Sequence, residues 1–186
     1  MECMHQERQY DLLQDEDLIQ VFEVYHKRVY SYFYYRVNDT NAAEDLTSQV
    51  FEKVIKNRTS YQKEKAPIGI WVFAIAKNCL NNYFRQQKRY QFAPIDTIVE
   101  WFSNKETPED YVLMGERNVK LHQSVNRLKE RERNIIALKF GAGLSNRDIA
   151  SIIEISETNV GSILYRSIKK LKKEMEKEDV VCLRKA

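Results

Sequence analysis

The sequence predicts an all-α protein in which two small helical domains are joined by a linker. Apolar residues recur at helical spacing along most of the 186 residues, and no stretch alternates apolar and polar residues between hairpin turn signals. Only five Gly and three Pro are present. Pro67 and Gly69 precede one long helical stretch, while Gly141 and Gly143 end another, so these residues separate helices.

Composition divides the chain into four segments. We expect a first helical domain over residues 14–90, a linker over 91–118, a second helical domain over 119–175 and a short tail over 176–186. Residues 52–90 carry nine Lys and Arg against two Asp and Glu, and residues 119–175 carry twelve against six, whereas the linker carries two against six. Two basic blocks favour two separate surfaces for polyanions, although two solvated helical faces remain an alternative on charge alone.

Several classes of protein do not fit the sequence. The longest apolar run, Ile70–Ala76, is far shorter than the ~18 residues that span a bilayer, and the acidic N-terminus does not resemble a signal peptide. The three Cys are scattered, which favours a reduced, cytoplasmic setting. Because metal-ligand spacing, a Gly-rich phosphate loop and a nucleophile motif are all missing from the sequence, it predicts no catalytic residue, metal, cofactor or small-molecule substrate, and therefore no enzyme.

The stretch LSNRDIASIIEISETNVGSILYRSIKKLKK carries the most specific signal. Ser145 is placed to cap one helix, with Asp148 at its third position, and Ser156 to cap a second helix after a turn of a few residues. This spacing is typical of a helix-turn-helix, although an ordinary αα-hairpin is the alternative. Glu154 occupies the turn position where Gly is commonest, and a non-Gly residue with positive φ costs about 1 kcal/mol there.

The second of these helices is polar at its front and cationic at its rear. Such a helix suits the major groove of a DNA duplex, where the front contacts base edges and the rear contacts phosphates. The candidate duplex contacts are Arg147, Glu157, Thr158, Asn159, Gly161, Ser162, Tyr165, Arg166, Lys169 and Lys170.

The stretch IWVFAIAKNCLNNYFRQQKR, residues 70–89, contains four cations and no acid. At helical spacing, Val72 and Ala76 belong to a core-facing side, whereas Trp71, Asn78 and Arg85 share another side. Aromatic and amide groups can hold an unstacked base while cations contact phosphates, so this side favours single-stranded or melted nucleic acid. The alternative is that Trp71 simply packs inside a helical bundle.

A third stretch, AAEDLTSQVFEKV, predicts an amphipathic helix that starts at Thr40 or Asn41, with Glu44 and Asp45 in its first turn. An acidic helix of this kind can dock on another protein, and an ordinary bundle helix is the alternative.

Taken together, these three stretches resemble a bacterial RNA polymerase sigma factor of the sigma-70 family. Their order and the chain length are similar to the extracytoplasmic-function (ECF, group 4) type, which keeps only regions 2 and 4, and the resemblance covers about residues 15–90 and 119–175. It implies a factor that directs core RNA polymerase to specific promoters and aids strand opening. It also implies core RNA polymerase (clamp and flap) and promoter DNA as partners, together with an anti-sigma factor that can be membrane-anchored.

The resemblance assigns roles to particular residues. The second helix of the helix-turn-helix reads the −35 element in duplex form. Contacts to the −10 element are expected from Tyr61, Lys63, Lys65, Trp71, Asn78, Asn82, Arg85, Lys88 and Arg89. Contacts to core polymerase are expected from Asp45, Leu46, Ser48, Gln49, Phe51 and Glu52. The sequence departs from the family pattern at Ser48, where Gln is usual, at Ile68, where an aromatic is common, and at Glu154.

The linker is long enough for this interpretation. Its 28 residues extend at most ~90 Å, and the two promoter elements are offset by about two duplex turns, or ~70 Å. The alternative function is a stand-alone helix-turn-helix regulator of the LuxR type, in which residues 1–90 sense a signal or dimerise. Such a regulator has no use for the side of the helix that carries Trp71, Asn78 and Arg85.

Overall fold

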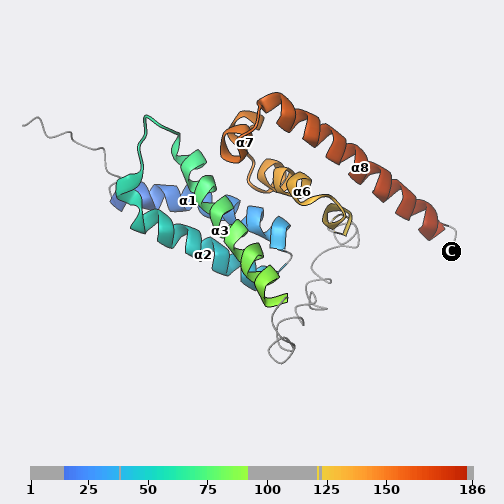
Figure 1. Cartoon of the computed structure of the whole chain (residues 1–186), viewed down its shortest axis with the longest axis horizontal. Helices are drawn as coiled ribbons and strands as arrows, with labels where there is room; N and C mark the ends of the chain where they lie inside the picture. Colours follow the sequence, from blue (N-terminus) through green and yellow to red (C-terminus); the bar gives the residue numbers. More distant parts are fainter. Residues whose placement is uncertain (1–14, 38, 92–120, 122, 184–186) are drawn as a thin grey trace, which may run out of the picture.

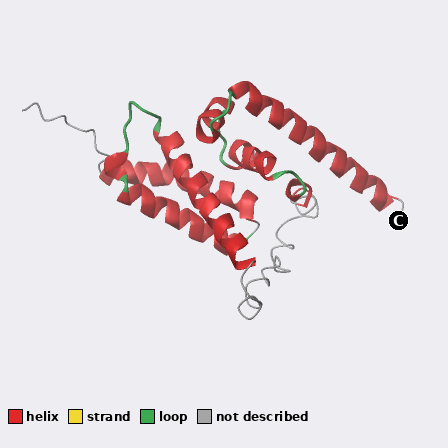
Figure 2. Ribbon diagram, in the orientation of Figure 1, coloured by secondary structure: helices red, strands yellow, loops and turns green. Residues whose placement is uncertain are grey.

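The structure is a computed structural model that describes residues 15–37, 39–91, 121 and 123–183. Within these ranges the chain forms helices, turns and loops but no strand, which confirms the predicted all-α class (Figure 2). The predicted linker lies almost entirely outside the described residues, and the domain boundaries proposed above stay predictions.

The first unit is a bundle of three helices, α1 (Asp15–Val37), α2 (Thr40–Lys56) and α3 (Ile68–Gln91), with a 3-10 turn η1 (Arg58–Ser60) after α2. Its core is made of large apolar side chains that repeat at helical spacing, among them the fully buried Val29, Phe33, Val50, Val72 and Phe73. These residues include the core-facing side that the sequence predicted for residues 70–89.

Two local details of this bundle differ from the expectation. Asp39 caps α2, since its Oδ1 accepts a hydrogen bond from the Ala42 N–H at 2.9 Å, so Glu44 and Asp45 lie just beyond the first turn. Gly69 lies inside the first turn of α3 rather than in a loop. A side chain there would meet the Tyr25 hydroxyl, because an ideal Cβ would lie 2.8 Å from it.

The second unit contains α6 (Glu130–Ile136), which continues into a π-helical turn η3 (Ala137–Gly141), then α7 (Asn146–Ile153) and the long α8 (Glu157–Leu183). Ile135, Leu138, Ile149 and Val160 are fully buried where these helices meet. Figure 1 shows α8 extending well beyond α7 towards the C-terminus.

The two units contact each other. The turn η3 packs against α1, and α7 packs against α3, so that the buried apolar residues of both units form one continuous cluster. This contact between the units is the part of the fold that the sequence did not predict.

No helix in the part of the chain that the structure describes is both long and apolar enough to cross a membrane.

Candidate nucleic-acid interfaces

The helix-turn-helix is built as its capping residues predict. Ser145 Oγ accepts a hydrogen bond from the Asp148 N–H at 3.1 Å, and the Asp148 carboxylate accepts one from the Ser145 N–H at 3.3 Å. Ser156 Oγ accepts from the Asn159 N–H at 3.2 Å at the start of α8. Between the helices, Glu154 adopts the left-handed conformation with φ 58° and ψ 52°. Two capped helices and a tight turn fix the angle at which α8 is presented.

The front of α8 is open. Val160, Ile163 and Leu164 are buried against the rest of the unit. The predicted duplex contacts on the other side are exposed or, for Gly161, half-buried. A shallow hollow of about 580 Å³ lies at this front, lined by Asn146, Glu157, Thr158, Gly161, Ser162 and Tyr165. The structure therefore brings five predicted residues together on one surface.

Asn146 is a member of this surface that the sequence analysis missed. It is the first residue of α7, and a side chain at Gly161 would lie 3.9 Å from its Nδ2, so Asn146 sits where α7 meets α8. Its Oδ1 is buried and has no hydrogen-bond partner among the described residues. The sequence could have indicated this residue, because Asn146 directly follows the capping Ser145.

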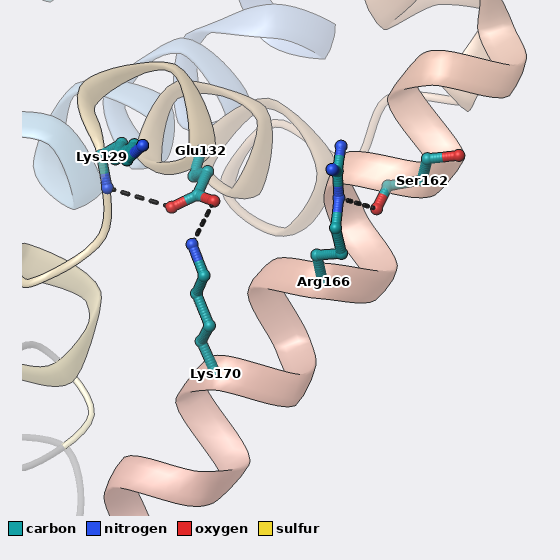
Figure 3. Close-up of polar contacts among 5 residues, drawn as sticks. All are labelled: Lys129, Glu132, Ser162, Arg166 and Lys170. Atoms are coloured by element: carbon teal, nitrogen blue, oxygen red, sulfur yellow. Dashed lines mark hydrogen bonds and ion pairs between the residues drawn. The ribbon is translucent and has the colours of Figure 1, made fainter.

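The cationic rear of α8 makes contacts within the protein that the sequence did not predict (Figure 3). Lys170 donates a hydrogen bond to the Glu132 carboxylate of α6, and the same carboxylate accepts one from the Lys129 N–H at 3.1 Å. These contacts, led by the hydrogen bond from Lys170, hold the pKa of Glu132 below its ordinary value. Lys170 therefore ties α8 to α6, which weakens its assignment as a phosphate contact.

Arg166 keeps its guanidinium on the outside of α8. Its Nε donates to the Ser162 carbonyl oxygen at 3.2 Å, and the side chain lies along the helix towards the front (Figure 3). Lys169 and Arg147 are exposed on the same unit. These cations are available to phosphates that flank a duplex seated on the front of α8.

The predicted strand-binding side of α3 is also open. Asn78, Asn82, Arg85, Lys88 and Arg89 are all exposed. Arg85 donates a hydrogen bond to the Asn82 side-chain oxygen at 3.1 Å, which orders both side chains. A hollow of about 570 Å³ at this end of α3 is lined by Asn81, Phe84, Arg85, Lys88 and Arg89 together with Glu130 of α6.

The other end of this side carries the aromatic pair. The rings of Tyr61 and Trp71 lie 5.3 Å apart, and both side chains are half-buried, so each packs on the bundle and still presents an edge to solvent. Partial burial raises the pKa of Tyr61, and the nearby Tyr25 and Glu64 raise it further. The Tyr61 phenol therefore stays a hydrogen-bond donor at neutral pH. Lys63 and Lys65 are exposed in the loop beside the pair.

The predicted polymerase-docking side of α2 is only partly exposed. Asp45, Ser48, Gln49 and Glu52 face solvent. Leu46 is 3% exposed and Phe51 is 7% exposed, so these two apolar side chains belong to the core beneath this side and do not form its surface. Their apolar spacing indicated burial as much as docking, and burial is what the structure shows.

A patch on α1 extends this side and was not predicted. Ile19 is 62% and Phe22 is 47% exposed. The Phe22 ring lies 4.9 Å from that of Phe51 and 4.6 Å from that of His26, and Ile55 of α2 is 54% exposed. A contiguous apolar patch on a protein surface can mark a site of contact with another protein. Periodicity could not reveal this patch, because Phe22 lies seven residues before Val29 and shares its stripe on α1.

The helix-turn-helix with its open front defines a DNA-binding protein, and a bundle with a cationic helix lies beside it. Comparison with known proteins agrees. The model of Sigma-70 region 2 matches residues 21–90, and the model of Sigma-70, region 4 matches residues 118–171. The chain belongs to the sigma-70 family and is an ECF sigma factor, a subunit that directs RNA polymerase to specific promoters.

Relatives support the same family, and a solved structure supports the same fold. The chain is 27% identical to the ECF RNA polymerase sigma factor BldN of Streptomyces coelicolor over 81% of this chain and 57% of BldN. It is also 27% identical to the RNA polymerase sigma factor YlaC of Bacillus subtilis, over 87% of this chain and 92% of YlaC. The fold is similar to that of the sigma factor RpoE from Bartonella quintana, solved with the anti-sigma factor NepR, with a TM-score of 0.69 and 19% identity over 87% of this chain and 98% of that chain.

Proposed function

We propose that the two surfaces divide promoter recognition between them, with the front of α8 reading the −35 element as duplex and the exposed side of α3 holding a separated strand of the −10 element. The observation that carries this division is the exposure of both surfaces: the polar front of α8 and the amides and cations of α3 all face solvent. The protein has no catalytic role of its own in this scheme, and it works in the cytoplasm.

At the −35 element, the front of α8 supplies short polar side chains to base edges in the major groove. Thr158, Ser162 and Tyr165 line the hollow at this front, while Arg147, Arg166 and Lys169 lie outside it. Base contacts set sequence preference and phosphate contacts set register, so substitutions in the first group change which promoter is chosen. Substitutions in the second group weaken binding to all duplexes alike.

At the −10 element, α3 offers groups that need an unpaired base. The Tyr61–Trp71 pair supplies aromatic edges, and Asn78 supplies an exposed amide that can bond to the pairing edge of a base. Arg85, Lys88 and Arg89 follow along the helix and can contact the backbone of the same strand. From Trp71 to Arg89 the helix rises about 27 Å at ~1.5 Å per residue, enough for several nucleotides.

Core RNA polymerase docks on α2 in this scheme. The exposed Asp45, Ser48, Gln49 and Glu52 give a polar surface, and the apolar patch of Ile19, Phe22 and Ile55 lies at its edge. Protein interfaces combine apolar and polar side chains, and this side of the bundle offers both. The same patch is a reasonable contact for an anti-sigma factor, which we propose as a further partner.

Run-off transcription tests the proposal. Core polymerase with this protein should give discrete, promoter-specific products from a library of genomic fragments, and core polymerase alone should not. Asn78→Ala and Arg85→Ala should reduce the product from linear templates and recover on templates that are already melted at −10. Lys27→Ala is the matched control, because Lys27 is an exposed cation on α1 that belongs to neither set of predicted DNA contacts.

The LuxR-type alternative makes opposite predictions. A stand-alone regulator would bind a palindromic duplex tightly without polymerase, and Asn78→Ala would leave that binding unchanged. Such a result, with no promoter-specific product, would overturn the proposal.

A further inference from the structure

The hollow at the C-terminal end of α3 carries an excess of positive charge. Its described lining residues include three exposed cations of α3 and one acid of α6, namely Arg85, Lys88, Arg89 and Glu130. None of the three cations forms an ion pair within the part of the chain that the structure describes. We call this surface the α3–α6 hollow. Cations gathered on a concave surface without acid partners attract anions to it.

Two further arginines add buried charge next to the hollow. Arg36 of α1 is 5% exposed, and its guanidinium lies 5.1 Å from the ring of Phe84, which lines the hollow. Nε and Nη1 of Arg36, and Nε of Arg133 of α6, are buried without a hydrogen-bond partner among the described residues. Burial lowers the pKa of Arg36, and the Arg133 guanidinium lowers it further, whereas the Glu130 carboxylate raises it. The Arg36 charge is therefore close to both Arg133 and the acid of the hollow.

Buried charge makes this hollow a stronger anion site than a row of exposed lysines. Water and salt screen an exposed cation, but they screen the field of a buried guanidinium much less. An anion in the hollow also stabilises the fold, because it neutralises a charge that burial disfavours. Anion binding and folding stability are thus coupled here.

The spacing of the cations suits a compact anion with several charges. Arg85, Lys88 and Arg89 are three and four residues apart on one helix, so they fall within a rise of about 6 Å. A DNA strand brings at most about two phosphates to such a span, because even in a duplex its phosphates are ~3.4 Å apart along the axis. Three linked phosphates bring their whole charge to it. Beside the cations, the Phe84 ring can stack on a base, and the Asn81 amide can bond to a base edge.

We propose that the α3–α6 hollow binds a free nucleoside triphosphate, with its phosphates on Arg85, Lys88 and Arg89 and its base against Phe84. The volume of about 570 Å³ is within the range of small-molecule sites, about 300–1,000 Å³. Arg36 acts on the phosphates as a charge and not as a contact, because its unpaired nitrogen atoms are buried.

Binding of the nucleotide has a consequence for promoter recognition. Arg85, Lys88 and Arg89 are also the proposed backbone contacts of the −10 strand, so the nucleotide and the strand compete for them. This consequence rests on the proposed function, whereas the nucleotide site itself stands on the geometry of the hollow.

Isothermal titration calorimetry on the full-length protein tests the site, with ATP as the probe and no added magnesium. ATP should bind, and it should raise the Tm of the protein when it is in excess. Tripolyphosphate should bind about tenfold more weakly than ATP, because it lacks the base that stacks on Phe84. Adenosine, which lacks the phosphates, should give no measurable heat of binding.

Variants separate the contacts from the buried charge. Arg89→Ala should weaken ATP binding about tenfold, since it removes a charge-assisted contact. Arg36→Met should weaken it about threefold, Arg36→Lys should restore most of that loss, and neither should lower the Tm of the protein without ATP. Glu130→Gln should tighten ATP binding, because it removes the acid of the hollow. Lys27→Ala is the matched control, since Lys27 is an exposed cation of α1 that does not line the hollow.

Three outcomes overturn the nucleotide site. They are no binding of ATP, binding that neither Arg89→Ala nor Arg36→Met weakens, and a marked fall in the Tm of Arg36→Met without ATP. The last would mean that the Arg36 charge has a partner outside the described residues.

A single-stranded −10 oligonucleotide distinguishes this proposal from the proposed function. Asn78→Ala should weaken binding of the oligonucleotide and leave binding of ATP unchanged, and ATP should displace the oligonucleotide from the unchanged protein. Binding of ATP without binding of the oligonucleotide rejects the strand contact and supports the nucleotide site. Binding of the oligonucleotide without binding of ATP rejects the nucleotide site and leaves the proposed function standing.

Discussion

Replacing Ser145 by Ala should destabilise the helix-turn-helix by a measurable amount. The hydroxyl accepts the Asp148 N–H at 3.1 Å, and the Asp148 carboxylate in return holds the Ser145 N–H and O–H. The helix α7 is only eight residues long, so one lost cap is a large part of its end stabilisation. Loss of a serine cap costs about 1 kcal/mol, in a range of roughly 0.5–2. In a chain of this size, 1 kcal/mol corresponds to a fall in Tm of about 2–4 °C.

Urea denaturation followed by circular dichroism measures this cost. Asp148→Ala removes the other half of the capping box, and the double variant should lose less stability than the two single losses added together, because each residue has already lost its partner. Ser151→Ala is the matched control. Its hydroxyl lies on the same helix and donates only to the Arg147 carbonyl oxygen one turn back, so stability should stay within about 0.5 kcal/mol.

The reasoning fails if Ser145→Ala shifts the urea midpoint no more than Ser151→Ala does, or if the losses from Ser145→Ala and Asp148→Ala simply add. In either case the reciprocal hydrogen bonds would contribute nothing beyond what water supplies. The presentation of α8 would then depend on packing alone.

Three further predictions follow from the described contacts. Ile149→Ala should lower the free energy of unfolding by about 2–5 kcal/mol in urea denaturation, because the side chain is fully buried, whereas Ile168→Ala, at an exposed position, should change it by less than about 0.5. Arg85→Gln should reduce the slope of log K against log salt for single-stranded −10 DNA by about 0.7, measured by fluorescence anisotropy, and an unchanged slope would remove Arg85 from the strand contact. The hydrogen bond from Lys170 keeps the pKa of Glu132 in the folded protein below its pKa in the unfolded chain. The Glu132 carboxylate therefore stabilises the fold at pH values above the unfolded pKa, and this contribution is lost as the pH falls through the folded pKa. Glu132→Gln should therefore flatten the acid side of the stability–pH curve, and a variant curve parallel to that of the unchanged protein would contradict the assignment.

The helix-turn-helix could be predicted closely because its determinants are local. The capping hydrogen bonds of Ser145, Asp148 and Ser156 each join residues three positions apart. The left-handed turn at Glu154 lies between the two capped helices. Helical periodicity likewise separated the buried and exposed sides of α3, since every turn of one helix repeats the same two environments.

The partners across the contact between the two units could not be predicted in this way. Arg28 and Ala142 are 114 residues apart, and nothing in the periodicity of α1 distinguishes Arg28 from an ordinary exposed cation. The same limit explains Lys170, which looked like a free cation of α8 until its acid partner on α6 was placed beside it. Leu46 and Phe51 were predicted as docking contacts and are buried instead. An apolar residue at helical spacing fits a docking surface and a core equally well, so the sequence could not separate the two.

Glu154 shows how a local exception can be explained by a distant contact. Its left-handed backbone costs about 1 kcal/mol relative to Gly, while an ion pair as exposed as the one with Lys77 returns roughly 0–1. The ion pair therefore offsets no more than the cost of the turn. Glu154 also places a carboxylate beside Lys77, on the helix that carries Asn78. Its side chain therefore joins the turn of the helix-turn-helix to α3, a contact that a glycine at this position would lack.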